Sequence, residues 1–428
     1  MRQNKDYLIT EKPSRALLIF SIPMIIGNLF QQAYTIVDSA IVGRYVGETA
    51  LAAVGASYAL TSIFICIAIG GGIGASVIIS HHFGAHNYGR MKTCIRTALL
   101  SFLFISLILG GVGLIFSQQI MEVLNTPADA IDIAVTYLNI YFLGLPFLFM
   151  YNILSSMFNA LGESRIPLYL LIFSSVLNIF LDLYMVAVLN LGVVGAAYAT
   201  FISQGISAVL SLIIFVVTLQ QLQGKAEGWF SKTEFSDMSR IALPSILQQS
   251  TVSIGMMLVQ SVVNSFGTQI LAGFSAAMRI ESLCVVPMSA IGNAMSSYTA
   301  QNIGAEKEER ISQGYRMGNF MIIVIAVILC LFLEIAHKPL VALFLDNAAS
   351  SQTIVTGESY LKFIGFFFCM IGFKMAVDGI LRGAGAVKVF TIANMVNLTL
   401  RVTIAKFGAP IWGVSMVWYA VPLGWLAN

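Results

Sequence analysis

The stretch GAHNYGRMKTCIR, Gly84 to Arg96, returns with substitutions as GAEKEERISQGYR, Gly304 to Arg316, at an offset of 220 residues. The same offset pairs Gly47, Leu51, Ala52, Ala56, Gly72 and Ser76 with Gly267, Leu271, Ala272, Ala276, Gly292 and Ser296. Further along, YLNIYFLG from Tyr137 matches YLKFIGFF from Tyr360 at an offset of 223. The chain is therefore predicted to consist of two halves that share one fold.

Composition places both halves in a lipid bilayer. Of the 428 residues, 58% are hydrophobic and only 10% are charged, whereas charged residues normally make up about a quarter of a soluble chain. Apolar runs long enough to cross a bilayer, about 20 helical residues each, begin near residues 16, 50, 94, 133, 167, 193, 239, 269, 317, 355, 388 and 411. They do not alternate as the strands of a closed barrel would. We therefore predict an all-α integral membrane protein with twelve transmembrane helices.

Six spans in each half would bring both halves into the membrane from the same side, which makes the repeat parallel. The predicted organisation is an N-terminal lobe over 1–219, a cytoplasmic linker over 220–237 and a C-terminal lobe over 238–428. Transporters use such repeats and handle their substrate near mid-membrane where the repeats meet. Channels and flippases also use internal symmetry, so the repeat favours transport without proving it.

The positions of the basic residues predict the orientation of the chain. Every second loop is rich in lysine and arginine, beginning with Arg2, Lys5, Lys12 and Arg15 before the first span. The intervening loops hold only Arg44, Lys338 and Lys406. By the positive-inside rule, the N-terminus is predicted to be cytoplasmic.

Asp38 lies near the end of an otherwise apolar run, and a charged aspartate at the centre of a bilayer costs roughly 2.5–3.5 kcal/mol. The first span runs outward from about residue 16, which places Asp38 in its outer half. The fifth span brings Asn178 and Asp182 to the same level, on one helical face because they are four residues apart. Other spans add three hydroxyl groups at this depth, from Tyr137, Tyr141 and Thr200.

Two carboxylates with an amide and hydroxyls suit proton or sodium chemistry. Neighbouring carboxylates in a low-dielectric site resist double ionisation, so one is expected to bind a proton near physiological pH or to share a small cation. In the alternative interpretation, Asp38 and Asp182 lie close to the outer interface and are hydrated or hydrogen-bonded to neighbouring helices. Pro23 removes one backbone hydrogen bond from the first span. A bend there would couple Asp38 to helix motion, unless it is a static kink.

The second half does not copy this cluster. Under the 223-residue offset, Arg401 stands opposite Asn178 and Ala405 opposite Asp182. Glu281 is a deep acid, expected either to contact a cationic substrate or to pair structurally with Arg279 or Arg401.

Three other features are given structural interpretations. Lys374 and Asp378 are spaced for an ion pair along one helix. HHFGAH, His81 to His86, loses every histidine in its repeat counterpart QNIGAE, so a helix end is predicted there and no metal site. The five cysteines have no motif spacing and are interpreted as packing residues.

With these residues in view, the chain resembles the multidrug and toxic compound extrusion (MATE) family over essentially its whole length. The resemblance rests on the order and spacing of IPMIIGNLFQQAYTIVDSAIVGRYVG, GAHNYGRMK, NALGESRIP, NIFLD and GVVGAAYAT. It implies two six-helix lobes and cation-coupled export of lipophilic, often cationic drugs by alternating access. It also implies a prokaryotic inner-membrane protein that acts as a monomer, with no cofactor beyond a coupling proton or sodium ion and no nucleic-acid partner.

In the DNA-damage-inducible (DinF-like) branch of this family, the coupling carboxylate is an aspartate of the first helix, which matches Asp38. The associated polar cluster matches Asn178, Asp182 and Thr200, and Tyr137 fits by spacing with Tyr141 as its rival. Another branch uses an acidic residue in the seventh helix. The predicted seventh helix, SRIALPSILQQSTVSIGMMLVQSVVN, has none, which favours the first branch. Substrate contacts are expected from Glu281, Tyr141, Gln31 and Gln32.

Other classes of function are less compatible with the sequence. A lipid or lipid-linked oligosaccharide flippase can share the lobe architecture, but it should concentrate basic residues in its cavity. The spans hold few, chiefly Arg279, Lys374 and Arg401, so the flippase stays the alternative. An intramembrane enzyme is not predicted, because the chain has neither an H-E-x-x-H nor a G-x-S-x-G motif.

Overall fold

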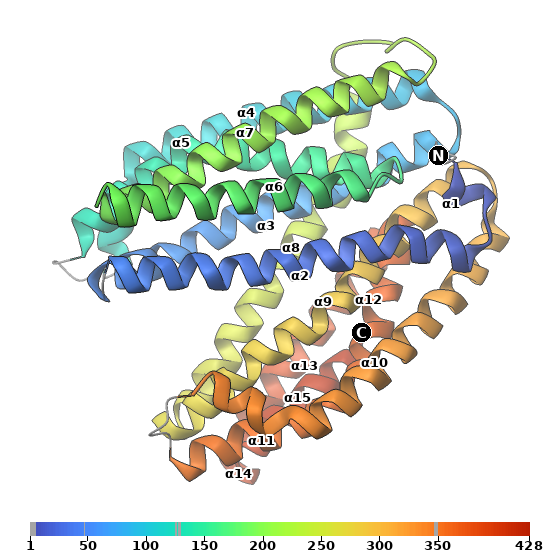
Figure 1. The fold of residues 1–428 in the computed structure, drawn as a ribbon. Coiled ribbons are helices and arrows are strands. Elements are labelled where there is room, and N and C mark those ends of the chain that lie inside the picture. Colours follow the sequence, from blue (N-terminus) through green and yellow to red (C-terminus); the bar gives the residue numbers. More distant parts are fainter. Residues whose placement is uncertain (1–5, 47, 125, 127–129, 346–349) are drawn as a thin grey trace. The chain divides into compact units, whose positions relative to one another are not determined.

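The computed structural model describes residues 6–46, 48–124, 126, 130–345 and 350–428, and all its elements there are helical. Arg2, Lys5 and Gly47, used above for the charge pattern and the repeat, lie outside the described residues. The elements of the first half are α1 Tyr7–Thr10, α2 Pro13–Tyr45, α3 Glu48–Gly84, α4 Tyr88–Val123, α5 Ile131–Ala160, α6 Arg165–Asp182, η1 Leu183–Val188 and α7 Gly192–Gln220 (Figure 1). Those of the second half are α8 Lys232–Asn264, α9 Thr268–Gly304, α10 Glu308–Leu343, α11 Ser351–Gly365, α12 Phe368–Gly383, α13 Val387–Thr403, η2 Ile404–Gly408, α14 Ala409–Trp412 and α15 Ser415–Leu426.

The all-α class is confirmed, and the described residues account for ten or eleven of the twelve predicted spans. Within the described residues, 10 helices are long and apolar enough to cross a membrane, and the bent pair of α11 and α12 makes up to 11. The two members of this pair meet at 55°. The twelfth predicted span, from residue 411, corresponds to α15, which has 12 described residues.

The repeat read from the sequence recurs in the backbone where α3 and α4 of the first half match α9 and α10 of the second. Helices α3 and α9 both have 37 residues, and α4 and α10 both have 36. The turn between them is also repeated, because His86 and Glu306 both adopt a positive φ, of 54° and 57°. After each, a backbone N–H returns to the preceding helix, from Asn87 to His82 O over 2.9 Å and from Lys307 to Asn302 O over 2.8 Å. These are Schellman endings, so GAHN and GAEK mark the same helix stop.

The contacts divide the chain into two compact units whose boundaries do not coincide with its halves. The first unit contains Ile26–Ile246, and the second contains Asp6–Ile25 with Leu247–Asn428. Helices α2 and α8 therefore each belong partly to both units. In each helix the change of unit follows closely after an internal proline, Pro23 in α2 and Pro244 in α8. The predicted lobes, 1–219 and 238–428, therefore differ from these units. The first part of α2 belongs to the second unit, and the first part of α8 belongs to the first unit.

The helices α6 and α13, at matching places in the repeat, share a further irregularity. Each continues directly into a π-helical segment, η1 after α6 and η2 after α13. Such segments widen the helix locally, and they are frequent at functional sites. Asp182 is the last residue of α6 and Arg401 lies in the last turn of α13, so both lie beside the irregular segment.

Candidate functional site

A buried polar cluster lies in the first unit, where α2 and α6 bring together the two predicted carboxyl groups. Asp38 projects from α2, and Asn178 and Asp182 project from consecutive turns of α6. Asn178 and Asp182 are 1% and 0% exposed. The carboxyl groups of Asp38 and Asp182 lie within hydrogen-bonding reach of each other. Because its side chain is fully buried, Asp182 is not a hydrated surface residue.

The amide of Asn178 connects the members of the cluster. With its nitrogen turned toward the acid, it donates to Asp182 Oδ2 over 2.8 Å and lies 2.8 Å from Tyr34 Oη. In this orientation its oxygen accepts from the backbone N–H of Thr200 over 3.1 Å. We assign this orientation because the reverse would face the amide oxygen toward the carboxylate. The other carboxyl oxygen, Asp182 Oδ1, has no hydrogen-bond donor among the described residues.

Tyr34 is a member of the cluster that the sequence reasoning missed. Its hydroxyl contacts Asn178, and it lies near Asp38, Asp182 and Tyr137. The signal was present in the sequence, because Tyr34 precedes Asp38 by four residues and so shares its helical face.

The two tyrosines proposed for α5 have different surroundings. Tyr137 lies near both carboxyl groups, whereas the Tyr141 hydroxyl donates to Thr61 O over 3.3 Å. Both line a cavity of about 20 Å³, to which Thr200 and Gln204 also contribute. Such a volume holds about one water molecule. The structure thus places Tyr137 with the cluster, while the Tyr141 hydroxyl contacts α3 and both side chains line the same water-sized space.

The remaining predicted residues of α2 lie outside the cluster. Gln31 is exposed and Gln32 is half-buried, and no contact in the described part of the chain joins their side chains to Asp38. Pro23 is buried inside α2, just before the helix changes unit.

The second half contains a different set of buried polar groups. Glu281, 6% exposed, accepts a hydrogen bond from the Tyr360 hydroxyl over 2.6 Å. Arg279 is exposed, and neither Arg279 nor Arg401 forms an ion pair with Glu281 among the described residues. Lys374 and Asp378 do form the predicted ion pair, with Lys374 Nζ 2.6 Å from Asp378 Oδ2.

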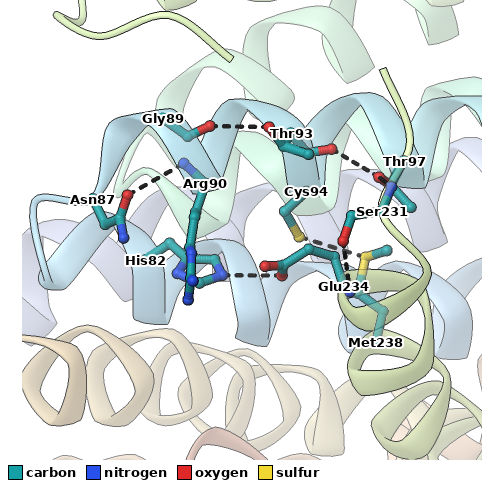
Figure 2. A network of polar contacts seen from close by, with 10 residues as sticks. All are labelled: His82, Asn87, Gly89, Arg90, Thr93, Cys94, Thr97, Ser231, Glu234 and Met238. Atoms are coloured by element: carbon teal, nitrogen blue, oxygen red, sulfur yellow. Dashed lines mark hydrogen bonds and ion pairs between the residues drawn. The ribbon is translucent and has the colours of Figure 1, made fainter. Parts of the chain in front are cut away.

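A third polar network holds the segment between α7 and α8 against α4 (Figure 2). The Thr93 and Thr97 hydroxyls accept the backbone N–H groups of Glu227 and Ser231 over 2.9 and 3.0 Å. His82, one of the histidines weighed above as a metal ligand, instead contacts Glu234 over 3.0 Å. Because α8 begins at Lys232, this helix does contain two acids that the predicted seventh helix lacked, Glu234 and Asp237. Glu234 lies in the first turn of α8 and contacts α3, and Asp237 pairs with Arg240 of the same helix.

The comparisons with known proteins agree with this architecture. The profile of the MatE family matches residues 23–184 and again 244–406, once in each half. The chain belongs to this family. It is therefore a multi-pass membrane transporter and not an enzyme.

Individual relatives cover nearly the whole chain. YpnP of Bacillus subtilis (strain 168), described as a probable multidrug resistance protein, is 32% identical over 384 residues, which are 90% of this chain and 85% of YpnP. A protein of Shewanella oneidensis (strain ATCC 700550) described as an FAD transporter is 23% identical over 427 residues, covering 98% and 94% of the two chains. A solved outward-facing MATE transporter of the MOP superfamily matches with a TM-score of 0.92 at 24% identity, covering 100% of this chain and 96% of that one.

Proposed function

We propose that the chain is a cation-coupled antiporter that exports lipophilic, cationic drugs by alternating access. The coupling ion, a proton or a sodium ion, would be exchanged at Asp38 and Asp182. One observation supports this assignment above all others: the half-buried Asp38 and the fully buried Asp182 lie within hydrogen-bonding reach of each other, and no described lysine or arginine forms an ion pair with either of them. Export of drugs is supported by the 32% identity with a relative described as a multidrug resistance protein.

The cluster has the composition that a coupling site requires. Two adjacent carboxylates in a low-dielectric environment repel each other, so the pair gains a proton or a small cation more readily than either acid alone. The Asn178 amide and the Tyr34 and Tyr137 hydroxyls are near enough to orient the acids or to supply oxygen ligands. Loading and unloading of this pair would change the net charge at the end of α6, beside the π-helical segment η1.

Pro23 would couple ion binding at Asp38 to a bend of α2. The helix that holds Asp38 changes unit just after this proline, and a proline weakens the hydrogen bonding of a helix where it lies. We propose that protonation of Asp38 bends α2 near Pro23 and expels the substrate. A cluster confined to the first half also supports a place near the DinF-like branch, because both acids of α8 lie in its first two turns, Glu234 against His82 and Asp237 against Arg240.

The test is dye export from vesicles that contain the purified protein, with proton and sodium gradients imposed separately. Ethidium fluorescence reports export by the wild type, Asp38→Asn, Asp182→Asn and Glu281→Gln. Asp132→Asn is the matched control, since this exposed aspartate in the first turn of α5 receives the same chemical change away from the cluster. We expect Asp38→Asn to reduce gradient-driven export to background. Asp132→Asn should export as the wild type does, and Glu281→Gln should keep much of the wild-type export.

The gradient that drives export by the wild type identifies the ion. Normal gradient-driven export by Asp38→Asn would contradict the proposed site. The absence of dye export under either gradient would contradict the proposed substrate class.

The orientation is a separate proposal, supported by the arginines and lysines of alternate loops. With the N-terminus and the segment between α7 and α8 in the cytoplasm, the Glu227 region would resist proteases added outside intact cells. Cleavage of that region in intact cells would contradict it.

A further inference from the structure

The second unit encloses a cavity of about 200 Å³ that the drug-export proposal does not use. Its lining comes from α8, α9, α12, α13 and α15. Most of the wall is apolar, with Met256, Met278, Leu398 and Trp425 among its residues. The charged members of the wall are two cations, Lys374 and Arg401, and one acid, Glu281. A mostly apolar cavity with a few converging polar groups is the usual form of a small-molecule site.

The two cations of this cavity differ in how they are neutralised. Lys374 is paired with Asp378 and also donates to Asn394 Oδ1 over 2.8 Å. Asp378 is in turn held by donors from Gln248, Asn394 and Asn428, at 3.1 to 3.3 Å. Both charges of this pair are therefore satisfied inside the protein.

Arg401 has no such partner. It is only 8% exposed, yet it forms no ion pair among the described residues, and its Nε has no hydrogen-bond acceptor. Glu281 is close enough to interact with it electrostatically, but its carboxylate accepts from Tyr360. A guanidinium is always charged, and a buried charge without a paired acceptor is costly. The cavity therefore presents a largely buried cation with a donor, Nε, that no described residue accepts from.

We propose that this cavity binds the anionic oxygen group of an amphipathic molecule, a carboxylate or a phosphate, through Arg401. The planar guanidinium can hold two oxygens at once. The amides of Asn394 and Asn397 lie in the same wall, and Trp425 with the methionines accommodates an apolar body. At about 200 Å³ the cavity lies below the usual 300–1,000 Å³ of drug-sized sites. It therefore takes a headgroup or a two-ring acid, not a large dye.

Glu281 allows a second test of the proposal, because its carboxylate lines the same cavity. A second negative charge near Arg401 competes with a bound anion. Glu281→Gln should therefore strengthen anion binding, whereas Arg401→Gln should weaken it. A site for cations would respond in the opposite direction to both changes.

The test uses equilibrium dialysis of three ligands with the same ring system: 2-naphthoate, neutral 2-naphthamide and cationic 2-naphthylmethylamine. The full chain is held in nanodiscs of phosphatidylcholine, as the wild type, Arg401→Gln, Glu281→Gln and Arg279→Gln. Arg279→Gln is the matched control, because it removes an exposed arginine of the same unit that does not line the cavity.

We expect the wild type to bind naphthoate more tightly than the other two ligands. Arg401→Gln should weaken naphthoate binding about tenfold or more, and change naphthamide binding by less than about twofold. Glu281→Gln should tighten naphthoate binding severalfold. Naphthoate binding no tighter than naphthamide binding in the wild type, or a naphthoate affinity that is equal in Arg401→Gln and Arg279→Gln, would overturn the proposal. If Arg401→Gln does not fold, the effect of Glu281→Gln on naphthoate affinity still tests the proposal.

The source of the anionic group is settled by adding phosphatidylglycerol to the nanodiscs. If the lipid lowers naphthoate binding to the wild type and leaves binding to Arg401→Gln unchanged, the site takes a lipid headgroup. If naphthoate binding to the wild type is unaffected by the lipid, the site takes a free organic anion. The test is independent of export, so a failed coupling experiment at Asp38 and a failed anion experiment at Arg401 are distinguishable.

Discussion

The two halves of this protein repeat helices of equal length, α3 and α4 against α9 and α10, but carry groups of opposite charge on the matching helices α6 and α13. In the first half, Asn178 and Asp182 on α6 meet Asp38, and the cluster is acidic. In the second half, the matching position to Asn178 holds Arg401, and Ala405 replaces Asp182. Gly162 and Gly385, which precede these helices, both have a positive φ, of 79° and 68°, and fix the register. The difference shows that the apolar residues determine the fold while a few buried positions set the charge.

The second half also contains its own internal cation beside a buried acid. Lys374 precedes Asp378 by four residues on α12, the same spacing that separates Asn178 from Asp182 on α6. An acid neutralised by a tethered lysine has no need of a proton or a metal ion. The comparison therefore predicts that a lysine at position 178 would convert the first cluster into a closed ion pair.

Asn178→Lys should have the largest effect on transport. Its ammonium would lie one helical turn from Asp182, as Lys374 does from Asp378, and would replace the coupling ion permanently. We expect gradient-driven ethidium export to fall to background, a loss of about a hundredfold or more, comparable with the loss of a group essential for coupling. Ethidium export from vesicles under an imposed ion gradient measures this loss.

Asn178→Met is the control for this change, because it removes the amide without adding a charge. It should retain measurable export. Equal export by Asn178→Lys and the wild type would show that the acidic character of the first cluster is not required.

Lys374→Met should have the largest effect on stability. It leaves Asp378, at 1% exposed, without the ammonium that contacts it; the buried Arg382 interacts with Asp378 electrostatically but forms no ion pair with it among the described residues. Removing one partner of a buried pair typically costs about 3–5 kcal/mol. Thermal unfolding in detergent should show a large fall in the midpoint, and the double variant Lys374→Met with Asp378→Leu should recover most of it. Equal stability of the single and double variants would mean that Asp378 is not charged in the folded protein.

The repeated glycines Gly72 and Gly292 should respond unequally to alanine. A Cβ on Gly292 would meet the carbonyl oxygen of Met375 at 2.6 Å, whereas one on Gly72 would meet the Ser156 hydroxyl at 2.5 Å. A side chain can rotate away but a backbone carbonyl cannot. We expect Gly292→Ala to lower the free energy of unfolding by about 1–3 kcal/mol and Gly72→Ala by less. The reverse order in thermal unfolding would contradict the packing argument.

Trp229→Ala should have the smallest effect. Its ring lies 4.6 Å from the Arg96 guanidinium but is 74% exposed, and such a contact contributes roughly 0.5–1 kcal/mol. Export should be unchanged, with a small fall in the thermal midpoint. A fall in export would show that the segment between α7 and α8 takes part in the transport cycle.

Much of the candidate cluster was predictable because helical depth and spacing constrain where a polar residue can point. Asp38, Asn178 and Asp182 were placed at one level from the sequence, and the structure brings them into contact. Tyr34 was within reach of the same argument. Which of Tyr137 and Tyr141 joins the cluster was not, because both lie on one face of α5 and only the packing against α3 separates them.

The sequence by itself determined the helical class, the repeat and the membrane location, because apolar length and periodicity are local properties of the chain. It did not determine that the tenth predicted span would be the bent pair of α11 and α12, which meet at 55°, because such a bend depends on packing and not on composition. Nor did it show that α2 and α8 each divide between two compact units just after a proline. Only the tertiary structure left the Nε of Arg401 without an acceptor. Whether a buried charge finds a partner depends here on side chains from five helices that are far apart in sequence.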